Sequence, residues 1–328
     1  MRKFILPALI LLAAIICGCA GTAAASAQEY FSIGMAYFEL GKYEEAEKWL
    51  NRARQSDKTM TASQYNLGRL AFERQRYGEA ARLFEDILKK DPDNVLALRA
   101  AAYTRIKTGE IYIAQRHYGR LLELVPESAD DGYNHALVLY AMERYDEAEQ
   151  VLEKYRFALQ DSKDMLLLYA RTQNAQKKVE AIDSFSSWLN EYTDPKVRYE
   201  YALALEEHEL YARALEEYRK AISEVTSSTE DIKKSDIRFA LARVLLIADS
   251  ESAEGITEMQ SAVKEGFNDI AAIEELIESG KVTGANLNSL ENIAYDMRRT
   301  EEEQSEEEEA EESFLETDPE GEFQSSQE

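Results

Sequence analysis

Apolar positions between residues 27 and 265 recur three and four residues apart, in short segments separated by polar stretches. This spacing places apolar side chains along one face of an α-helix. The segments follow one another in pairs, as two amphipathic helices joined by a tight turn would. With only five prolines and fourteen glycines in 328 residues, helix is favoured almost throughout. We expect an all-α chain of antiparallel helix pairs.

A fixed period of small residues marks these pairs. Six alanines recur with spacings of 34, 34, 34, 33 and 33 residues, namely Ala46, Ala80, Ala114, Ala148, Ala181 and Ala214. Twelve positions before most of them lies another small residue: Gly34, Gly68, Ala102, Ala136 and Ala202. Four positions after them lie Leu50, Phe84, Tyr118, Leu152, Phe185 and Tyr218. Facing small residues let two helices approach closely, so each period is one packed hairpin. Glycines such as Gly41 and Gly109 mark the turns within hairpins.

This pattern resembles the tetratricopeptide repeat, over residues 27 to about 265. The resemblance implies an α-solenoid (a superhelix of about six to seven repeats). Repeats 1 to 4 are expected at 27–60, 61–94, 95–128 and 129–161, repeats 5 and 6 start near Ser162 and Pro195, and a seventh pair spans 234–248 and 252–264. Repeat 5 departs most, because Tyr169 and Lys178 replace the expected small and aromatic residues.

The two ends of the solenoid are expected to differ. An open helical stack needs a cap for its apolar end, and we assign that role to two helices within residues 266–300. Residues 301–328 hold fourteen Asp or Glu and no Lys or Arg. They have little apolar mass to bury, so we predict a disordered acidic tail.

The N-terminal residues resemble a bacterial lipoprotein signal. Arg2 and Lys3 precede a thirteen-residue apolar run that is short for a membrane span. The run ends in Ile16-Cys17-Gly18-Cys19, which resembles a lipobox, although Cys17 is unusual at its position. By that resemblance residues 1–18 are the signal peptide, Cys19 carries the lipid, and residues 19–26 tether the solenoid to the membrane. Cleavage after Ala27 and an uncleaved signal anchor are the alternatives.

Location and partners follow from the same features. The resemblance implies a periplasm-facing protein of the bacterial envelope, and Ala20 after the cysteine favours the outer membrane over the inner. The net charge of −25 repels phosphate backbones, which argues against nucleic acid as a partner. Both cysteines lie in the N-terminal segment, so the body has no cysteine-based metal site. No metal or other cofactor is expected.

In the family that this chain resembles, ligands lie in a concave groove built by the first helix of each repeat. The groove positions most relevant to binding are Tyr65, Asn66, Arg69, Arg99, Tyr103, Tyr133 and Asn134. In repeat 6 the matching positions are Tyr199 and Glu200. Tyrosine suits recognition because it buries area at little entropic cost. The alternative interpretation is that the asparagines stabilise the repeat and the arginines are ordinary surface charges.

No catalytic motif is evident, and the three histidines fall in three different repeats. We therefore predict no enzyme activity. The expected function is a membrane-anchored scaffold that binds envelope proteins or peptides in its groove. The alternative is a repeat protein that accompanies a periplasmic solute-binding transporter and carries a small-ligand pore or forms an oligomer.

Overall fold

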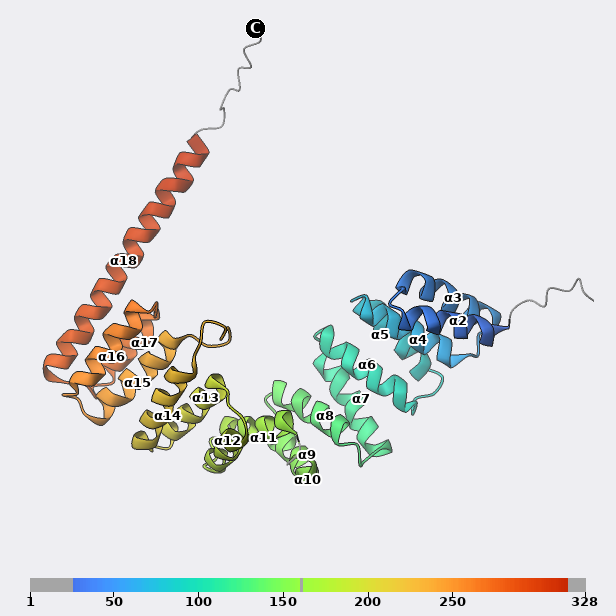
Figure 1. Cartoon of the computed structure of the whole chain (residues 1–328), viewed down its shortest axis with the longest axis horizontal. Coiled ribbons are helices and arrows are strands. Elements are labelled where there is room, and N and C mark those ends of the chain that lie inside the picture. The colour runs from blue at the N-terminus through green and yellow to red at the C-terminus, as the bar shows by residue number, and fades with distance from the viewer. Residues whose placement is uncertain (1–25, 160–161, 318–328) are drawn as a thin grey trace, which may run out of the picture. The chain divides into compact units, whose positions relative to one another are not determined.

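The computed structural model describes residues 26–159 and 162–317, and each regular element in these ranges is helical (Figure 1). The chain divides into two compact units, Met1–Ala158 and Leu159–Glu328. The predicted solenoid of antiparallel helix pairs is confirmed. The predicted signal peptide, Cys19 and the predicted tether up to residue 25 lie outside the described residues. Within the described ranges, no helix combines the length and apolar content needed to cross a membrane.

The N-terminal unit contains four helix pairs in sequence order. Its helices are α2 (Ala27–Glu39), α3 (Tyr43–Ser56), α4 (Thr61–Glu73), α5 (Tyr77–Leu88), α6 (Val95–Lys107), α7 (Ile111–Leu124), α8 (Ala129–Ala141) and α9 (Tyr145–Lys154), followed by the short α10 (Arg156–Leu159). Side chains cap several first helices. Ser26 and Glu29 form a capping box at α2, and Asn94 caps α6. These caps satisfy backbone N–H groups that a helix start leaves unpaired.

The periodic residues form the core in both units. Each of the six alanines is fully buried, and the large residue four positions later is at most 1% exposed. The facing glycines allow this packing. A Cβ atom at Gly34 would lie 2.8 Å from Leu50 Cγ, and one at Gly68 would lie 2.6 Å from Phe84 Cε1. The periodic small residues therefore mark the places where the two helices of a hairpin pack closely.

The turns inside six of the hairpins each hold one residue in the left-handed region. Gly41 and Gly109 adopt φ values of 69° and 75°, as the sequence predicts. The other four hairpins place ordinary residues there: Gln75, Glu143, Lys177 and Glu209, with φ between 56° and 59°. A side chain makes this conformation unfavourable, whereas glycine adopts it freely.

Glycine at these turns should stabilise the fold. We expect Gln75→Gly and Glu143→Gly each to raise the free energy of unfolding by about 0.5–1 kcal/mol, because both side chains are exposed and only backbone strain is relieved. Urea unfolding followed by circular dichroism measures the change. The reverse substitution, Gly41→Ala, should destabilise by a similar amount. A destabilising effect of both glycine substitutions would contradict the argument.

The C-terminal unit continues the pairing and ends in two capping helices. Its helices are α11 (Lys163–Ala175), α12 (Glu180–Glu191), α13 (Pro195–Glu207), α14 (Tyr211–Glu224), α15 (Lys234–Ala248), α16 (Ala253–Lys264), α17 (Ile270–Glu278) and α18 (Gly284–Thr317). One buried cluster joins α15 and α16 to α17 and the start of α18, with Leu246, Met259, Ile273 and Leu290 fully buried. This cluster covers the last repeat.

The described part of the acidic tail, residues 301–317, continues α18 as helix to Thr317 (Figure 1). Glutamate has a high intrinsic helix propensity. The packed first turns of α18 also supply the helix nucleus that an isolated acidic peptide would have to form by itself. Composition showed that this segment cannot build a core, but it did not exclude a solvated helix.

Candidate functional site

The first helices of the N-terminal unit carry a row of aromatic side chains. Tyr103 on α6 is 44% exposed, and its ring centre lies 5.4 Å from that of Phe72 on α4. Phe72 in turn packs edge-on against Tyr77 at 5.1 Å. Tyr65, also on α4, is half-buried with its ring centre 5.6 Å from Phe84. Of the predicted tyrosines on α4 and α6, Tyr103 is the more accessible to a ligand.

Two cations lie over this row. The Arg69 guanidinium is 4.9 Å from the ring centre of Phe38 on α2, and Lys107 Nζ is 5.6 Å from that of Tyr103. Both side chains are exposed, and neither forms an ion pair with any residue that the structure describes. We call Phe38, Arg69, Phe72, Tyr103 and Lys107 the cation–aromatic strip. Its charges are free for a ligand, and its rings supply apolar area.

Arg99 has a different environment from Arg69. Its Nε and Nη2 atoms donate to Oδ1 and Oδ2 of Asp131 on α8, at 2.7 and 2.6 Å. The Asp131 side chain is 1% exposed, whereas that of Arg99 is 43% exposed. Burial would raise the pKa of Asp131, but hydrogen bonds from Arg99 and Ser128 outweigh it and hold this pKa below its ordinary value. The pair joins two adjacent repeats.

The asparagines mainly serve their own helices. Asn66 Nδ2 donates to the carbonyl of Ala62 at 2.9 Å, and Asn134 Nδ2 donates to that of Asp130 at 2.8 Å. Asn66 Oδ1 also accepts a hydrogen bond from Arg69 at 3.0 Å, which orients that side chain. These contacts agree with the interpretation of both asparagines as repeat-stabilising residues. Tyr133, on α8, is half-buried.

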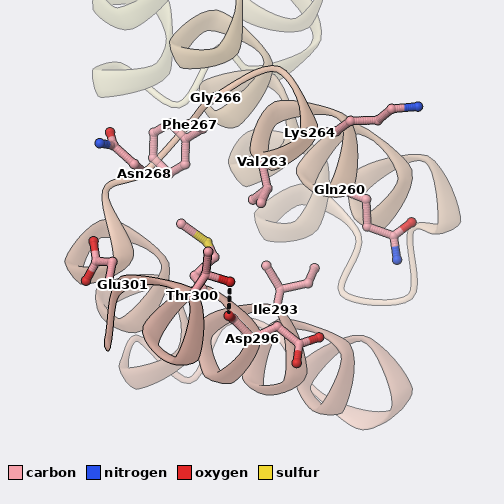
Figure 2. A pocket seen from close by; sticks show the side chains of 11 residues that line it. Gln260, Val263, Lys264, Gly266, Phe267, Asn268, Ile293, Asp296, Thr300 and Glu301 are labelled. Atoms are coloured by element: carbon pink, nitrogen blue, oxygen red, sulfur yellow. Dashed lines mark hydrogen bonds between the residues drawn. The ribbon is translucent and has the colours of Figure 1, made fainter. Parts of the chain in front are cut away.

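The C-terminal unit contains two cavities that share Phe267 and Asn268. One, of about 490 Å³, lies between α16, the loop before α17 and α18. Figure 2 shows Val263 and Ile293 facing its interior from opposite sides, with Phe267 at its edge. The other, of about 640 Å³, is lined by α13, α15 and the start of α17. Sequence reasoning missed both, although it named Tyr199 and Glu200, which line the second.

His117 lies on α7, His135 on α8 and His208 at the end of α13. His135 is 8% exposed, and burial lowers its pKa to about 4, so the imidazole is neutral at pH 7. His117 lies 3.0 Å from Glu85 in an ordinary polar contact. Among the residues that the structure describes, no three His, Cys, Asp or Glu side chains are arranged to hold a metal ion.

Comparison with known sequences agrees with the repeat architecture. Residues 27–59 and 62–94 match the family model of the tetratricopeptide repeat. An "Uncharacterized lipoprotein" of Treponema pallidum is 26% identical over 153 residues, which are 47% of this chain and 78% of that protein. Mouse N-alpha-acetyltransferase 16, a NatA auxiliary subunit, is 27% identical over 117 residues. These are 36% of this chain but only 14% of that protein.

Solved structures share the fold at low identity. A tetratricopeptide repeat protein from Parabacteroides merdae superposes with a TM-score of 0.53 and 20% identity, covering 77% of this chain and 97% of its own. YrrB, described as a tetratricopeptide repeat protein with an unusual peptide-binding site, gives a TM-score of 0.50 and 15% identity. That match covers 60% of this chain and 98% of YrrB. At such identities the likeness concerns the fold alone.

Proposed function

The chain is a tetratricopeptide repeat protein, and from this premise we propose that it is a lipid-anchored scaffold of the bacterial envelope that binds partner proteins or peptides. The cation–aromatic strip of the N-terminal unit carries the proposal. It combines exposed aromatic area with two cations that have no ion-pair partner among the described residues. Such a surface suits a partner segment that offers both apolar side chains and carboxylates.

The anchor is supported by the sequence and by one relative. Cys19 follows an apolar run in a lipobox-like context, and the Treponema pallidum relative is itself described as a lipoprotein. Several acyl chains on one N-terminus give stable membrane attachment, whereas a single chain does not. If Cys19 is lipidated, the residues between it and Ala27 reach at most about 25 Å when fully extended. Repeat 1 would then lie close to the bilayer, with the outer membrane as the favoured location.

Arg69 offers the direct test of the binding surface. We expect Arg69→Glu to weaken partner binding by at least about tenfold, because it places a like charge against a carboxylate. The unfolding curve should change little, because Arg69 is exposed and its hydrogen bond to Asn66 is local. The measurement is affinity capture from crosslinked cells with quantitative mass spectrometry, followed by titration of the captured partner.

A matched control removes a cation elsewhere in the same unit. Arg82→Glu changes the charge equally, on a second helix (α5) instead of a first helix, and should leave capture intact. Equal capture by wild type and Arg69→Glu would remove the strip from the site. This chain should itself be recovered with the membrane fraction. Its recovery in the soluble fraction would contradict the anchor.

A further inference from the structure

The cavity of about 640 Å³ lies wholly within the C-terminal unit, on the side formed by the first helices of its last pairs. α13 contributes Tyr199, α15 contributes Phe239, and the loop before α17 contributes Phe267. A volume in this range accommodates a side chain with its flanking backbone. Repeat 6 places Tyr199 at a predicted groove position, so the cavity lies on the side that the repeat register predicts to face a ligand.

Aromatic side chains give the cavity rigid walls. The rings of Phe239 and Phe267 stack with their centres 4.2 Å apart and an angle of 8° between their planes. The ring of Tyr199 packs against Tyr218, with centres 5.8 Å apart. Phe239 and Phe267 are nearly buried but still contribute surface to the cavity. Ring faces attract cations through their quadrupoles.

Two arginines near the cavity are already neutralised by carboxylates. Arg243 donates to both oxygens of Glu206, at 3.0 and 2.8 Å. Arg171 donates to both oxygens of Glu200, at 2.7 and 2.9 Å. Neither guanidinium is therefore available to an anionic ligand.

The charged lining residues that have no ion-pair partner among the described residues are mainly negative. Asp231, Asp236 and Asp269 line the cavity, and none of them forms an ion pair with a residue in the described ranges. Asp269 uses one oxygen to cap α17 by accepting from the backbone N–H of Ala272 at 3.0 Å. The lining contains the cations Arg243 and Lys196, of which Lys196 forms no ion pair with a described residue. Three carboxylates against one ammonium leave an excess of acceptors around aromatic walls.

We propose that this cavity binds a basic side chain, an arginine guanidinium or a lysine ammonium, presented by an extended segment of a partner protein. The aromatic walls contact the flat guanidinium or the aliphatic stem, and the aspartates accept its N–H groups. An acidic segment, such as α18 of a second copy, is repelled. The N-terminal strip offers free cations and this cavity offers free carboxylates, so the two units select partner segments of opposite charge.

The test uses the full chain and a defined probe. A short fluorescein-labelled peptide of alternating alanine and arginine is titrated by fluorescence anisotropy, next to the same peptide with citrulline in place of arginine. Citrulline keeps the shape of the side chain but removes its charge. The arginine peptide should bind at least about tenfold more tightly. Equal affinities would overturn the proposal.

Two double variants separate the cavity from the general negative charge of the unit. Asp231→Asn/Asp236→Asn removes two carboxylates from the lining and should weaken the arginine peptide by at least about tenfold. Glu251→Gln/Glu291→Gln removes two exposed charges outside the lining and should change affinity less than about twofold. Equal losses in both variants would show a diffuse charge effect and overturn the site. Because Arg69→Glu probes the other unit, failure here leaves the proposed function standing.

Discussion

Trp188→Ala should lower the free energy of unfolding of the C-terminal unit by about 3–5 kcal/mol, as expected for removal of a fully buried large aromatic side chain. Trp188 on α12 has no exposed surface. The centre of the Trp188 ring lies 5.1 Å from that of Tyr192. The Lys163 ammonium lies 5.1 Å from the centre of the Trp188 ring. Its Nε1 donates to the carbonyl of Lys163 at 3.0 Å, which ties α12 to the start of α11.

Hydrogen exchange measured by mass spectrometry shows which helices lose protection in the variant. In a helical stack each repeat contacts only its neighbours, so protection should fall first in α11 and α12. The other tryptophan of the chain is the matched control. Trp49 is half-buried against Tyr30, with ring centres 5.7 Å apart, and Trp49→Ala should cost about half as much. Equal costs, or uniform loss of protection along the chain, would contradict the assignment.

Repeat 5 shows which parts of the fold the sequence could predict. The period survives in Ala181 and Phe185, both fully buried, so the helix pair itself was predictable. Because Tyr169 and Lys178 replace the expected small and aromatic residues, the sequence did not predict how this pair packs. Trp188 supplies that packing from a position one turn after Phe185. The hydrogen bond from Trp188 to the carbonyl of Lys163 depends on how α12 lies against α11. The spacing of residues along one helix does not reveal this arrangement.

The tail and the turns illustrate a second limit. Glycine marked two of the turns, but four others hold Gln, Glu or Lys in the left-handed region because packing of the hairpin outweighs the local cost. The acidic composition of residues 301–317 indicated too little apolar mass for a core, but it did not reveal that α18 extends through them. At the turns the neighbouring structure overrode a local preference for glycine, whereas in the tail the intrinsic helix propensity of glutamate was not weighed against the composition.

The candidate site was predictable in outline only. Groove positions follow from the repeat register, and among them Tyr103 and Arg69 are exposed in the structure. The register does not reveal ion pairs between repeats. Arg69 and Arg99 look equivalent in the sequence, yet one has a carboxylate partner thirty-two positions later and the other has none among the described residues. The cavity of the C-terminal unit likewise depends on a loop outside the repeat period.

Arg99→Leu should therefore act on stability, in contrast to Arg69→Glu. It leaves the Asp131 carboxylate buried and without its bidentate partner. Removing one member of a buried pair costs several kcal/mol. Because Arg99 itself is 43% exposed, we expect a loss at the low end, about 2–3 kcal/mol at pH 7. Arg120→Leu, which breaks an ion pair between exposed side chains, should change the unfolding midpoint little.

The pH dependence identifies the cause of this loss. In the wild type the pKa of Asp131 lies below its ordinary value, so the pair contributes stability that is present above about pH 4 and is lost as pH falls through the folded-state pKa. In Arg99→Leu, burial without the cation raises the pKa of Asp131, and protonation on acidification relieves the buried charge. The difference in urea midpoint between the two proteins should thus be largest at pH 7 and shrink towards pH 4. A difference that stays constant over this range would show that lost packing of the Arg99 stem, and not the charge of Asp131, causes the destabilisation.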